Sequence, residues 1–342
     1  MSTLPIVAIT IGDPAGVGPD VVAAALAGGN LGDCCRPLVI GDRGTLERSA
    51  RVMGVSLPLH PVDEPAGAAY EPGVIDLIDL ANVSTELEIG KVQATAGQAA
   101  FAYIERATAL ALRGEVDAIA TAPINKEALK LGGVPYLDHT GAFASLTNSD
   151  DVTTMFVLDR LKIFFATRHM SLRRAIDDLT RDRVVDQLRH AHEQLERFGF
   201  QEPSIALAAL NPHGGESGLF GDEEITILAP AVEAARNRGI NATGPHPADS
   251  VFHNAAMGYH DAVLSLFHDQ GHIAAKTLDF DRTIAITTGL PVIRSSVDHG
   301  TAFDIAGTGK ARWLSMAEAV RVGAEYATRL KEREASRVSM GD

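Results

Sequence analysis

Short apolar runs alternate with amphipathic helical stretches along this chain, which limits the folds that it can adopt. The apolar runs have the length of strands and cover residues 6–11, 37–40, 118–122, 205–210 and 262–267. They are apolar without a break, as expected when helices cover both faces of a parallel sheet. The helical stretches carry apolar residues at a spacing of three to four and cover residues 96–113, 183–198, 223–238 and 315–332. This alternation predicts an α/β fold.

The length of the chain predicts more than one lobe. Its 342 residues exceed the ~250–300 residues that a single hydrophobic core usually supports. We therefore expect two lobes with an active-site cleft between them. No repeat or low-complexity linker marks the boundary, so it is inferred from topology. Residues 1–125 with about 286–342 are expected to form the first lobe, and about 126–285 the second.

The charge of the chain argues against nucleic acid and membrane partners. Lys and Arg number 30 against 44 Asp and Glu, which gives a formal net charge of −14. An acidic protein repels nucleic acid and anionic membranes, so an anionic substrate would need locally concentrated cations. No basic start precedes a long apolar run, and no window reaches the roughly 18 apolar residues of a membrane helix. We therefore expect a cytoplasmic protein.

Histidines follow three of the apolar runs, where each predicted strand ends. His169 follows the run that begins at Ile163, His213 follows the run 205–210, and His268 follows the run 262–267. In open parallel sheets, ligands bind outside the carboxyl ends of strands, so these histidines can converge. Neutral imidazoles with an open coordination position suit a catalytic divalent metal. Zinc is the first candidate, with cobalt, manganese and magnesium as alternatives, and a hydrogen-bonded loop role for each histidine stays open.

Two glycine-rich segments are candidates for binding an anion or a nucleotide. Residues 12–19 follow a strand and open a helix, where backbone amides can face an anion. Their spacing matches neither the dinucleotide fingerprint nor a P-loop. Residues 289–309 are predicted to form a loop over a site, with Asp298 or Asp304 accepting hydrogen bonds from a ribose or an adenine. A purely structural role stays open for both segments.

Motifs spread from one end of the chain to the other carry a resemblance to a known enzyme family. They are AITIGDPAGVGPD at Ala8, TAPINKEAL at Thr121, DHT at Asp138, NPHGGE at Asn211, FHDQGH at Phe267 and GLPVIRSSVDHGTAFDIAG at Gly289. Together they resemble the 4-hydroxythreonine-4-phosphate dehydrogenase family of vitamin B6 biosynthesis and its relatives acting on 4-phospho-threonate or 4-phospho-erythronate. CRPLVIGD at Cys35 and GHIAAK at Gly271 look more like the phospho-threonate and phospho-erythronate branch.

The resemblance implies a fold, an assembly and a set of site residues. The fold would be two α/β/α sandwich lobes like those of isocitrate and isopropylmalate dehydrogenases, in a homodimer whose subunits share active sites. The implied metal ligands are His169, His213 and His268, and the implied substrate-binding residues are His139, Thr140, Lys276 and Arg294. The implied cofactor-binding residues are Asp298, His299, Gly300, Thr301, Asp304 and Gly307. The nucleotide loop would then belong to the first lobe, and the metal and dimer contacts to the second.

The implied reaction is NAD-dependent oxidation of a small anionic hydroxy acid, with loss of its carboxylate. A bound metal would ease deprotonation of the hydroxyl and stabilise the enolate left by decarboxylation. Lys276 and Arg294 would supply positive charge, and Arg can grip a phosphate with two hydrogen bonds. Asp249 is the candidate acid or base, with Lys276 as a second. NAD is expected rather than NADP, since only Lys310 and Arg312 lie just beyond the acidic loop.

Two departures from the family pattern leave the substrate open. Ala285 stands where the family usually has Asn, and Gly141 stands where it usually has Glu. The loss of one hydrogen bond to a substrate costs on the order of 1–3 kcal/mol. One alternative is therefore a dehydrogenase of a non-phosphorylated carboxylated dihydrodiol, such as that of terephthalate. An alternative of another class is a metal-dependent hydrolase or phosphatase.

Overall fold

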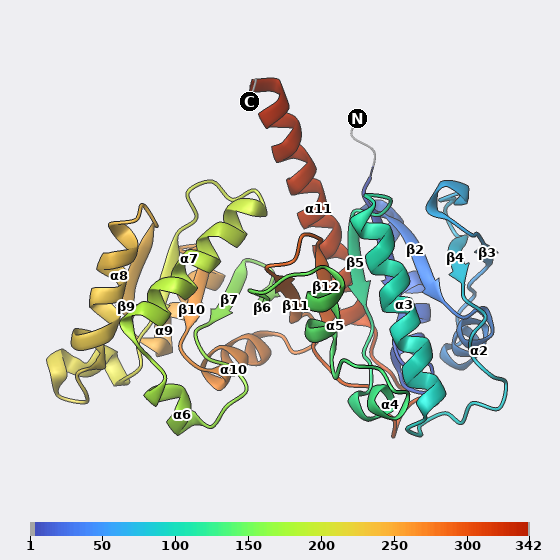
Figure 1. Cartoon of the computed structure of the whole chain (residues 1–342), viewed down its shortest axis with the longest axis horizontal. Coiled ribbons are helices and arrows are strands. Elements are labelled where there is room, and N and C mark those ends of the chain that lie inside the picture. The colour runs from blue at the N-terminus through green and yellow to red at the C-terminus, as the bar shows by residue number, and fades with distance from the viewer. Residues whose placement is uncertain (1–3, 341–342) are drawn as a thin grey trace. The chain divides into compact units, whose positions relative to one another are not determined.

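A computed structural model describes residues 4–340, which divide into two compact units (Figure 1). Unit 1 contains the described residues of Met1–Thr153 together with Ile284–Lys331. Unit 2 contains Thr154–Thr283 and the described residues of Glu332–Asp342. The boundary inferred from the sequence, near residue 126, lies inside unit 1, where α4 (Lys126–Leu131) and α5 (His139–Leu146) pack against α3 (Ala94–Leu112). No helix in the described part of the chain has the length and apolar character to cross a membrane.

Unit 1 is built on a largely parallel sheet in the strand order β3-β4-β2-β1-β5-β12-β11. Its strands are β1 (Ile6–Thr10), β2 (Arg36–Gly41), β3 (Leu59–Pro61), β4 (Ile75–Asp79), β5 (Ala118–Thr121), β11 (Ile284–Thr288) and β12 (Arg294–Val297). Neighbouring strands run parallel, except that β11 and β12 form an antiparallel pair. Because Thr10 and Thr121 are register partners, the carboxyl ends of β1 and β5 lie together at one edge.

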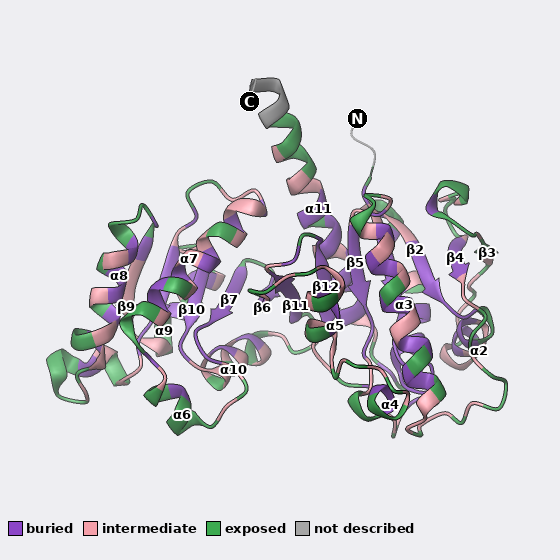
Figure 2. Cartoon of the chain, in the orientation of Figure 1, coloured by how far each residue is buried: buried purple, intermediate pink, exposed green. Residues whose placement is uncertain are grey.

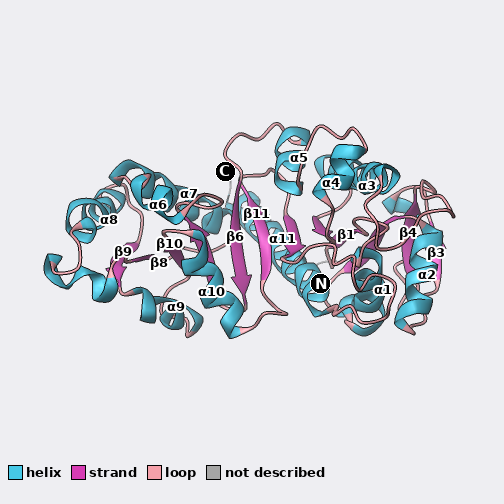
Figure 3. Ribbon diagram, turned by 90° about the horizontal axis from the view of Figure 1, so that it is seen from below, coloured by secondary structure: helices cyan, strands magenta, loops and turns pink. Residues whose placement is uncertain are grey.

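Helices cover both faces of the unit 1 sheet. They are α1 (Gly18–Gly28), α2 (Arg43–Met53), α3, α4, α5 and the unit 1 part of α11 (Leu314–Met340), with 3-10 turns η1 (Leu31–Asp33) and η2 (Pro65–Gly67). Figure 3 shows α3, α4 and α5 on one side of the strands and α1 and α2 on the other. The central strands are accordingly buried (Figure 2), as their unbroken apolar sequences predict.

Unit 2 repeats this design on a smaller sheet in the order β6-β7-β10-β8-β9. Its strands are β6 (Thr153–Leu158), β7 (Leu161–Phe165), β8 (Ile205–Ala208), β9 (Ala242–His246) and β10 (Ala262–Ser265). All neighbours are parallel except β6 and β7. Its helices are α6 (Leu172–Asp177), α7 (Arg181–Arg197), α8 (Ala229–Arg236), α9 (Ala248–Ala256) and α10 (His268–Leu278). In Figure 3, α7 and α8 lie on one face and α9 and α10 on the other.

The predicted α/β class is confirmed, and two local predictions need correction. β1, β2, β5, β8 and β10 coincide with the predicted apolar runs, and α3, α7 and α11 with predicted helices. The stretch 223–238 is not one α-helix, because a π-helical turn, η4 (Glu224–Leu228), precedes α8. The segment 289–309 is not one loop, because β12 forms within it and pairs with both β11 and β5. The strand has the sequence RSSV and is buried, although the flanking segments are rich in glycine.

Candidate functional site

Three adjacent parallel strands of unit 2 end at the same sheet edge, and each is followed by a histidine named above. β10 pairs with β7 on one side and with β8 on the other, both in parallel. His169 follows β7, His268 opens α10 directly after β10, and His213 lies in the turn η3 (Pro212–Gly218) after β8. The loops that carry the three histidines therefore leave the sheet side by side, at the edge where open α/β sheets bind ligands.

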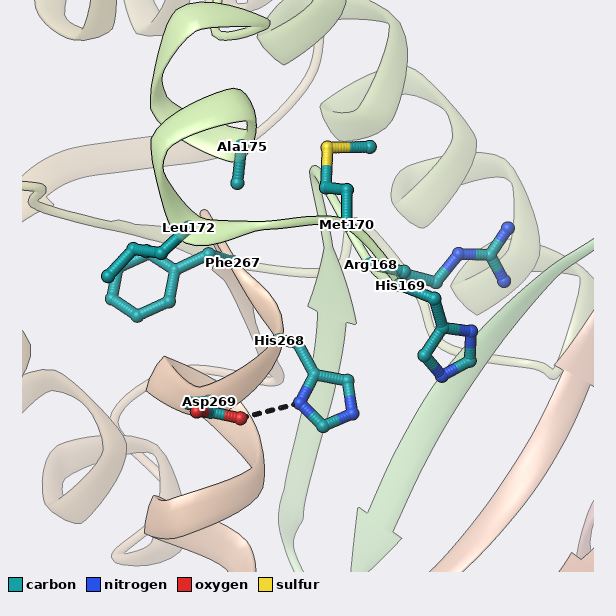
Figure 4. Close-up of a pocket in the computed structure, with 8 residues that line it drawn as sticks. All are labelled: Arg168, His169, Met170, Leu172, Ala175, Phe267, His268 and Asp269. Carbon is teal, nitrogen blue, oxygen red and sulfur yellow. Dashed lines mark hydrogen bonds and ion pairs between the residues drawn. The ribbon is translucent and has the colours of Figure 1, made fainter.

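His169 and His268 face a common pocket (Figure 4). Their ring centroids are 5.5 Å apart. The pocket has a volume of about 280 Å³ and is lined by Arg168, His169, Met170, Leu172, Ala175, Phe267, His268 and Asp269. Asp269 Oδ1 lies 2.7 Å from His268 Nδ1, and the His272 ring stacks on the His268 ring with centroids 3.5 Å apart. A proton held on Nδ1 by this carboxylate leaves the lone pair of His268 on Nε2, the arrangement that metal-binding histidines use.

The spacing of this pair fits a shared divalent metal. Two imidazoles on one tetrahedral zinc have ring centres about 5 Å apart, given Zn–N distances of about 2.0–2.1 Å. The 5.5 Å between His169 and His268 agrees with this value. Across residues 4–340, however, no three His, Cys, Asp or Glu side chains are grouped closely enough to hold a metal ion. The structure thus brings two of the three expected ligands together. His213 is exposed, and its role as the third ligand stays a prediction.

The turn that carries His213 has an unusual backbone. Residues 213–218 all have positive φ angles, from 45° at Glu216 to 95° at Gly218. A left-handed conformation costs roughly 1–2 kcal/mol for each residue that is not glycine. His213, Glu216 and Ser217 are such residues. Strain of this kind is typical of functional loops that the surrounding structure holds in place.

Glu224 and Gln270 hold these strand ends, and the sequence analysis identified neither. Glu224 accepts hydrogen bonds from the backbone N–H groups of Leu210 and Asn211, both at 2.7 Å. Burial works against the charge of Glu224, but the hydrogen bonds from Asn211 and Leu210 outweigh it and hold the pKa of the carboxyl below its usual value. Gln270 Nε2 donates to Ala209 O at 2.8 Å, while its Oε1 accepts from Leu266 N at 2.7 Å, so it ties β8 to β10. Two sequence features could have pointed to these residues. Glu224 precedes an apolar stretch, and Gln270 lies inside the motif FHDQGH.

Unit 1 contains a buried cation. Arg294, on β12, is 5% exposed, and its Nε and Nη2 donate to Thr121 Oγ1 at 3.1 and 2.6 Å. Its Nη1 donates to Thr287 Oγ1 at 2.8 Å, and the Phe143 ring centroid lies 5.6 Å from the guanidinium carbon. Burial lowers the pKa of Arg294 to about 9, and the charge of Asp138 opposes this shift. A charge held by neutral hydroxyls inside a protein is one that an anionic ligand would neutralise.

His139 lies beside this cation at the start of α5. Asp138 caps the helix by accepting a hydrogen bond from Gly141 N at 2.9 Å. Burial, followed by the charge of Arg294, holds the pKa of His139 well below 6.5, so the imidazole is neutral at pH 7. Its Nε2 atom is buried and has no hydrogen-bond partner. An unmatched buried nitrogen costs about 1–3 kcal/mol, which a ligand hydroxyl or anion would recover. Thr140 is half-buried beside it.

The two glycine-rich segments of unit 1 contact each other. Val17 N donates to Thr301 O at 2.9 Å, and Gly307 N donates to Asp20 Oδ2 at 2.9 Å. A Cβ at Gly16 would lie 2.9 Å from Thr301, so only glycine permits this approach. The amides of residues 13, 15, 16 and 17 all bond within the protein, which favours the structural role for residues 12–19.

The other residues expected to bind the cofactor lie on the loop after β12. His299 is half-buried with Nδ1 2.9 Å from Gly300 O, and its buried Nε2 has no hydrogen-bond partner. Asp298 is half-buried, whereas Gly300, Asp304 and Gly307 are exposed. The loop therefore presents backbone and carboxylate groups on its surface and is anchored through Thr301 and Gly307.

Lys276 and Asp249 lie on helices of unit 2. Lys276 is half-buried in the last turn of α10, with Nζ 5.4 Å from the Phe280 ring centroid. Asp249 is exposed in the first turn of α9. α9 packs against η3, the turn that carries His213. The predicted roles of both residues stay predictions.

The fold and the candidate sites define a class of protein with two α/β units. One unit has a pair of imidazoles, His169 and His268, beyond the ends of parallel strands. The other has the buried guanidinium of Arg294 beside the imidazole of His139. Comparison with known proteins then gives the family. The family model described as "Pyridoxal phosphate biosynthetic protein PdxA" matches residues 33–323. The chain belongs to this family, which confirms the resemblance seen in the motifs.

The relatives of the chain are named dehydrogenases. A protein of Symbiobacterium thermophilum named "Putative D-threonate 4-phosphate dehydrogenase" is 56% identical over 328 residues, which are 96% of this chain and 98% of that protein. The crystal structure of 4-hydroxythreonine-4-phosphate dehydrogenase from Klebsiella pneumoniae is 46% identical with a TM-score of 0.88, over 95% of this chain and 99% of that one. A terephthalate 1,2-cis-dihydrodiol dehydrogenase from Burkholderia xenovorans is 32% identical with a TM-score of 0.62, over 94% and 98%. The chain is thus an oxidoreductase of the dehydrogenase type, and its family implies NAD and a divalent metal.

Proposed function

We propose that this protein oxidises a phosphorylated four-carbon hydroxy acid with NAD and releases its carboxylate as CO2. 4-Phospho-threonate and 4-phospho-erythronate are the first candidate substrates, and 4-hydroxythreonine 4-phosphate is the next. Hydride passes from the carbinol carbon to NAD, and the hydroxyl proton is lost. The bond to the carboxylate carbon of the resulting β-keto acid then breaks, and its electron pair forms an enolate that takes up a proton.

The observation that carries this proposal is the buried guanidinium of Arg294 beside the unpaired Nε2 of His139. Arg294 is 5% exposed and is held by the hydroxyls of Thr121 and Thr287 rather than by a carboxylate. In a chain of net charge −14, a buried cation without a carboxylate partner in bonding contact suits an anionic ligand. A phosphate or carboxylate matches the planar donors of the guanidinium.

The other residues have roles that follow from their chemistry. His139 is neutral, so it can donate or accept one hydrogen bond to a substrate oxygen, and Thr140 beside it can do the same. Lys276 would add charge for the anionic substrate. Asp249 is the first candidate for proton transfer, and Lys276 is the second. The nucleotide would lie against the loop residues Asp298, His299, Gly300, Thr301, Asp304 and Gly307.

We also propose that His169, His213 and His268 hold the divalent metal. The donor set is all nitrogen, which favours zinc over manganese or magnesium, with cobalt next. A metal bound there would supply positive charge that eases loss of the hydroxyl proton and stabilises the enolate. What the chain itself contributes is the orientation of the imidazoles, as the contact between His268 and Asp269 illustrates.

Substrate oxidation followed by NADH absorbance tests the function. The metal-loaded protein is supplied with NAD and, in parallel, with 4-phospho-threonate, 4-phospho-erythronate, 4-hydroxythreonine 4-phosphate and the dephosphorylated acids. We expect one phosphorylated acid to be turned over with release of one CO2 per NADH. Equal turnover of the dephosphorylated acid would contradict the phosphate role of Arg294.

A second candidate substrate is a carboxylated ring dihydrodiol. It is favoured by Ala285, which removes an amide from the family pattern, and by the similarity to the terephthalate dihydrodiol dehydrogenase. The same absorbance assay with such a diol decides between the two. The relatives compared above are dehydrogenases, so the hydrolase alternative has no support from them.

We further propose a homodimer whose subunits share active sites. This proposal is supported by family membership alone. Light scattering over a hundredfold range of concentration should give the mass of two chains, and a monomer at all concentrations would contradict it.

A further inference from the structure

Glu224 is buried at the start of η4 and its carboxylate contacts the loop that follows β8. The residue is 4% exposed. Its Oε1 accepts hydrogen bonds from the backbone N–H groups of Leu210 and Asn211 at 2.7 Å, and its Oε2 accepts from Asn211 Nδ2 at 2.8 Å. One carboxylate thus receives three hydrogen bonds from two consecutive residues. These residues directly precede Pro212 and His213.

The same carboxylate also contacts the left-handed turn itself. Gly215 is buried in this turn with a φ angle of 82°, and a Cβ built on it would lie 2.8 Å from Glu224 Oε2. The turn therefore packs directly on the carboxylate, and a side chain at position 215 would displace Glu224 Oε2. A second acidic residue, Glu223, accepts from Asn211 Nδ2 at 2.6 Å, which fixes the orientation of the Asn211 amide. The start of the turn and its buried glycine are both held from one side by the first turn of η4.

We propose that Glu224 is the positioning residue for His213. It fixes Leu210 and Asn211, which precede Pro212 and the left-handed turn, and thereby sets the direction in which the His213 imidazole leaves the end of β8. Glu224 would bind neither metal nor substrate. This inference rests on the proposed role of His213 as a metal ligand.

The chemistry of Glu224 explains why a charged acceptor is needed there. Its oxygens meet only donors in the contacts described, namely two backbone N–H groups and one amide NH2. Glutamine has one acceptor oxygen, which can serve the two backbone groups, but its NH2 group would then face the NH2 group of Asn211. Glu224→Gln therefore keeps the size of the side chain and loosens the turn. Partners that orient metal ligands typically change metal affinity by about 10–100-fold when removed.

The test measures Co²⁺ binding, which reports the ligand set independently of turnover. Metal-free full-length protein is titrated with Co²⁺, and the visible d–d absorption reports the number and geometry of the ligands. We expect Glu224→Gln to lower Co²⁺ affinity at least tenfold and to change the spectrum, with NADH binding unchanged. Hydrogen exchange should become faster at the amides of Leu210 and Asn211. The matched control is Glu233→Gln, an exposed glutamate on α8, which should bind Co²⁺ like the wild type.

Two further variants keep the outcome interpretable. Asn211→Ala removes one hydrogen bond to Glu224 and leaves the two backbone bonds, so it should cause a smaller loss of Co²⁺ affinity. His213→Ala gives the affinity and spectrum of a site without this ligand. If His213→Ala weakens binding while Glu224→Gln keeps wild-type affinity and spectrum, the positioning role is overturned and the metal site stands. If His213→Ala itself binds Co²⁺ like the wild type, the ligand role of His213 fails, and the positioning role fails with it.

Discussion

The guanidinium of Arg294 donates two hydrogen bonds to one hydroxyl oxygen, Thr121 Oγ1, from Nε at 3.1 Å and from Nη2 at 2.6 Å. The two residues lie on the adjacent parallel strands β12 and β5. A third bond, from Nη1 to Thr287, attaches the other side of the guanidinium to β11. The side chain is thereby fixed in direction without being neutralised, which is the state of a cation prepared for an anionic ligand.

Arg294→Ala should selectively impair the phosphorylated substrate. Charge-assisted hydrogen bonds contribute about 1.5–3 kcal/mol each, so loss of one or two should lower kcat/KM by roughly 10- to 10,000-fold. A substrate without phosphate should lose much less, and the ratio of the two kcat/KM values corrects for any loss of folded protein. Arg282→Ala, at an exposed arginine just before β11, is the matched control. An equal loss for both substrates would remove the phosphate role.

His139 should make the folded protein less stable in acid. Its pKa in the folded protein lies well below 6.5, because it is buried next to Arg294. As the pH falls below about 6.5, the unfolded chain therefore binds a proton that the folded chain does not, and stability is lost at up to about 1.4 kcal/mol per pH unit. Thermal melts of the wild type and His139→Gln between pH 7.5 and 5 should diverge, with the variant less sensitive to acid. Parallel curves would show that His139 titrates normally.

Removal of the metal should abolish turnover without unfolding the chain. His169 follows β7 and His268 opens α10 after β10, and these two strands pair directly with each other, so we expect unit 2 to fold without the metal. Exhaustive chelation, or His169→Ala, His213→Ala or His268→Ala, should lower activity by several orders of magnitude while the circular dichroism stays unchanged. Zinc or cobalt should restore the chelated wild type. Full activity after chelation would eliminate metal-dependent chemistry.

The cofactor should be NAD rather than NADP. The exposed Asp304 and the half-buried Asp298 favour ribose hydroxyls over a 2′-phosphate, while the exposed Lys310 and Arg312 lie just beyond. We expect kcat/KM for NAD to exceed that for NADP at least tenfold. Lys310→Ala with Arg312→Ala should leave the NAD value unchanged. The opposite result would be similar kcat/KM values for NAD and NADP in the wild type and a lower value for NADP alone in the double variant. It would show that Lys310 and Arg312 reach the 2′-phosphate.

The sequence allowed the fold class to be predicted because it depends on local patterns. Unbroken apolar runs and the spacing of apolar residues in helices identify β1, β2 and α3 from neighbouring residues alone. The three histidine loops were also predictable, since strand ends can be located and parallel strands end together. The partners of Arg294 were not, because Thr121 and Thr287 become neighbours only through pairing of β12 with β5 and β11. The role of Glu224 depends likewise on a backbone that turns left-handed at His213.

We expect the residue at position 285 to influence the class of substrate that the protein accepts. Ala285 lies on β11 opposite Ser296 of β12, as Thr287 lies opposite Arg294. Alternate residues of a strand share a face, so Ala285 is on the same face as the hydroxyl that holds Arg294. It is 7% exposed. A side chain added there would therefore change the surroundings of Arg294, and Ser296 is the neighbouring polar group able to replace the missing family amide.

If the substrate is phosphorylated, Ala285→Asn should keep or raise kcat/KM for it. One added hydrogen bond, at about 1–3 kcal/mol, corresponds to a gain of roughly 5- to 150-fold, and the gain should be larger when Ser296→Ala is also present. Ile286→Val, on the opposite face of β11, is the control and should leave substrate preference unchanged. If Ala285→Asn abolishes activity, and the wild type oxidises a carboxylated ring diol well, then the phosphate assignment is wrong. Ala285 would in that case provide room for a bulkier and less polar substrate beside Arg294.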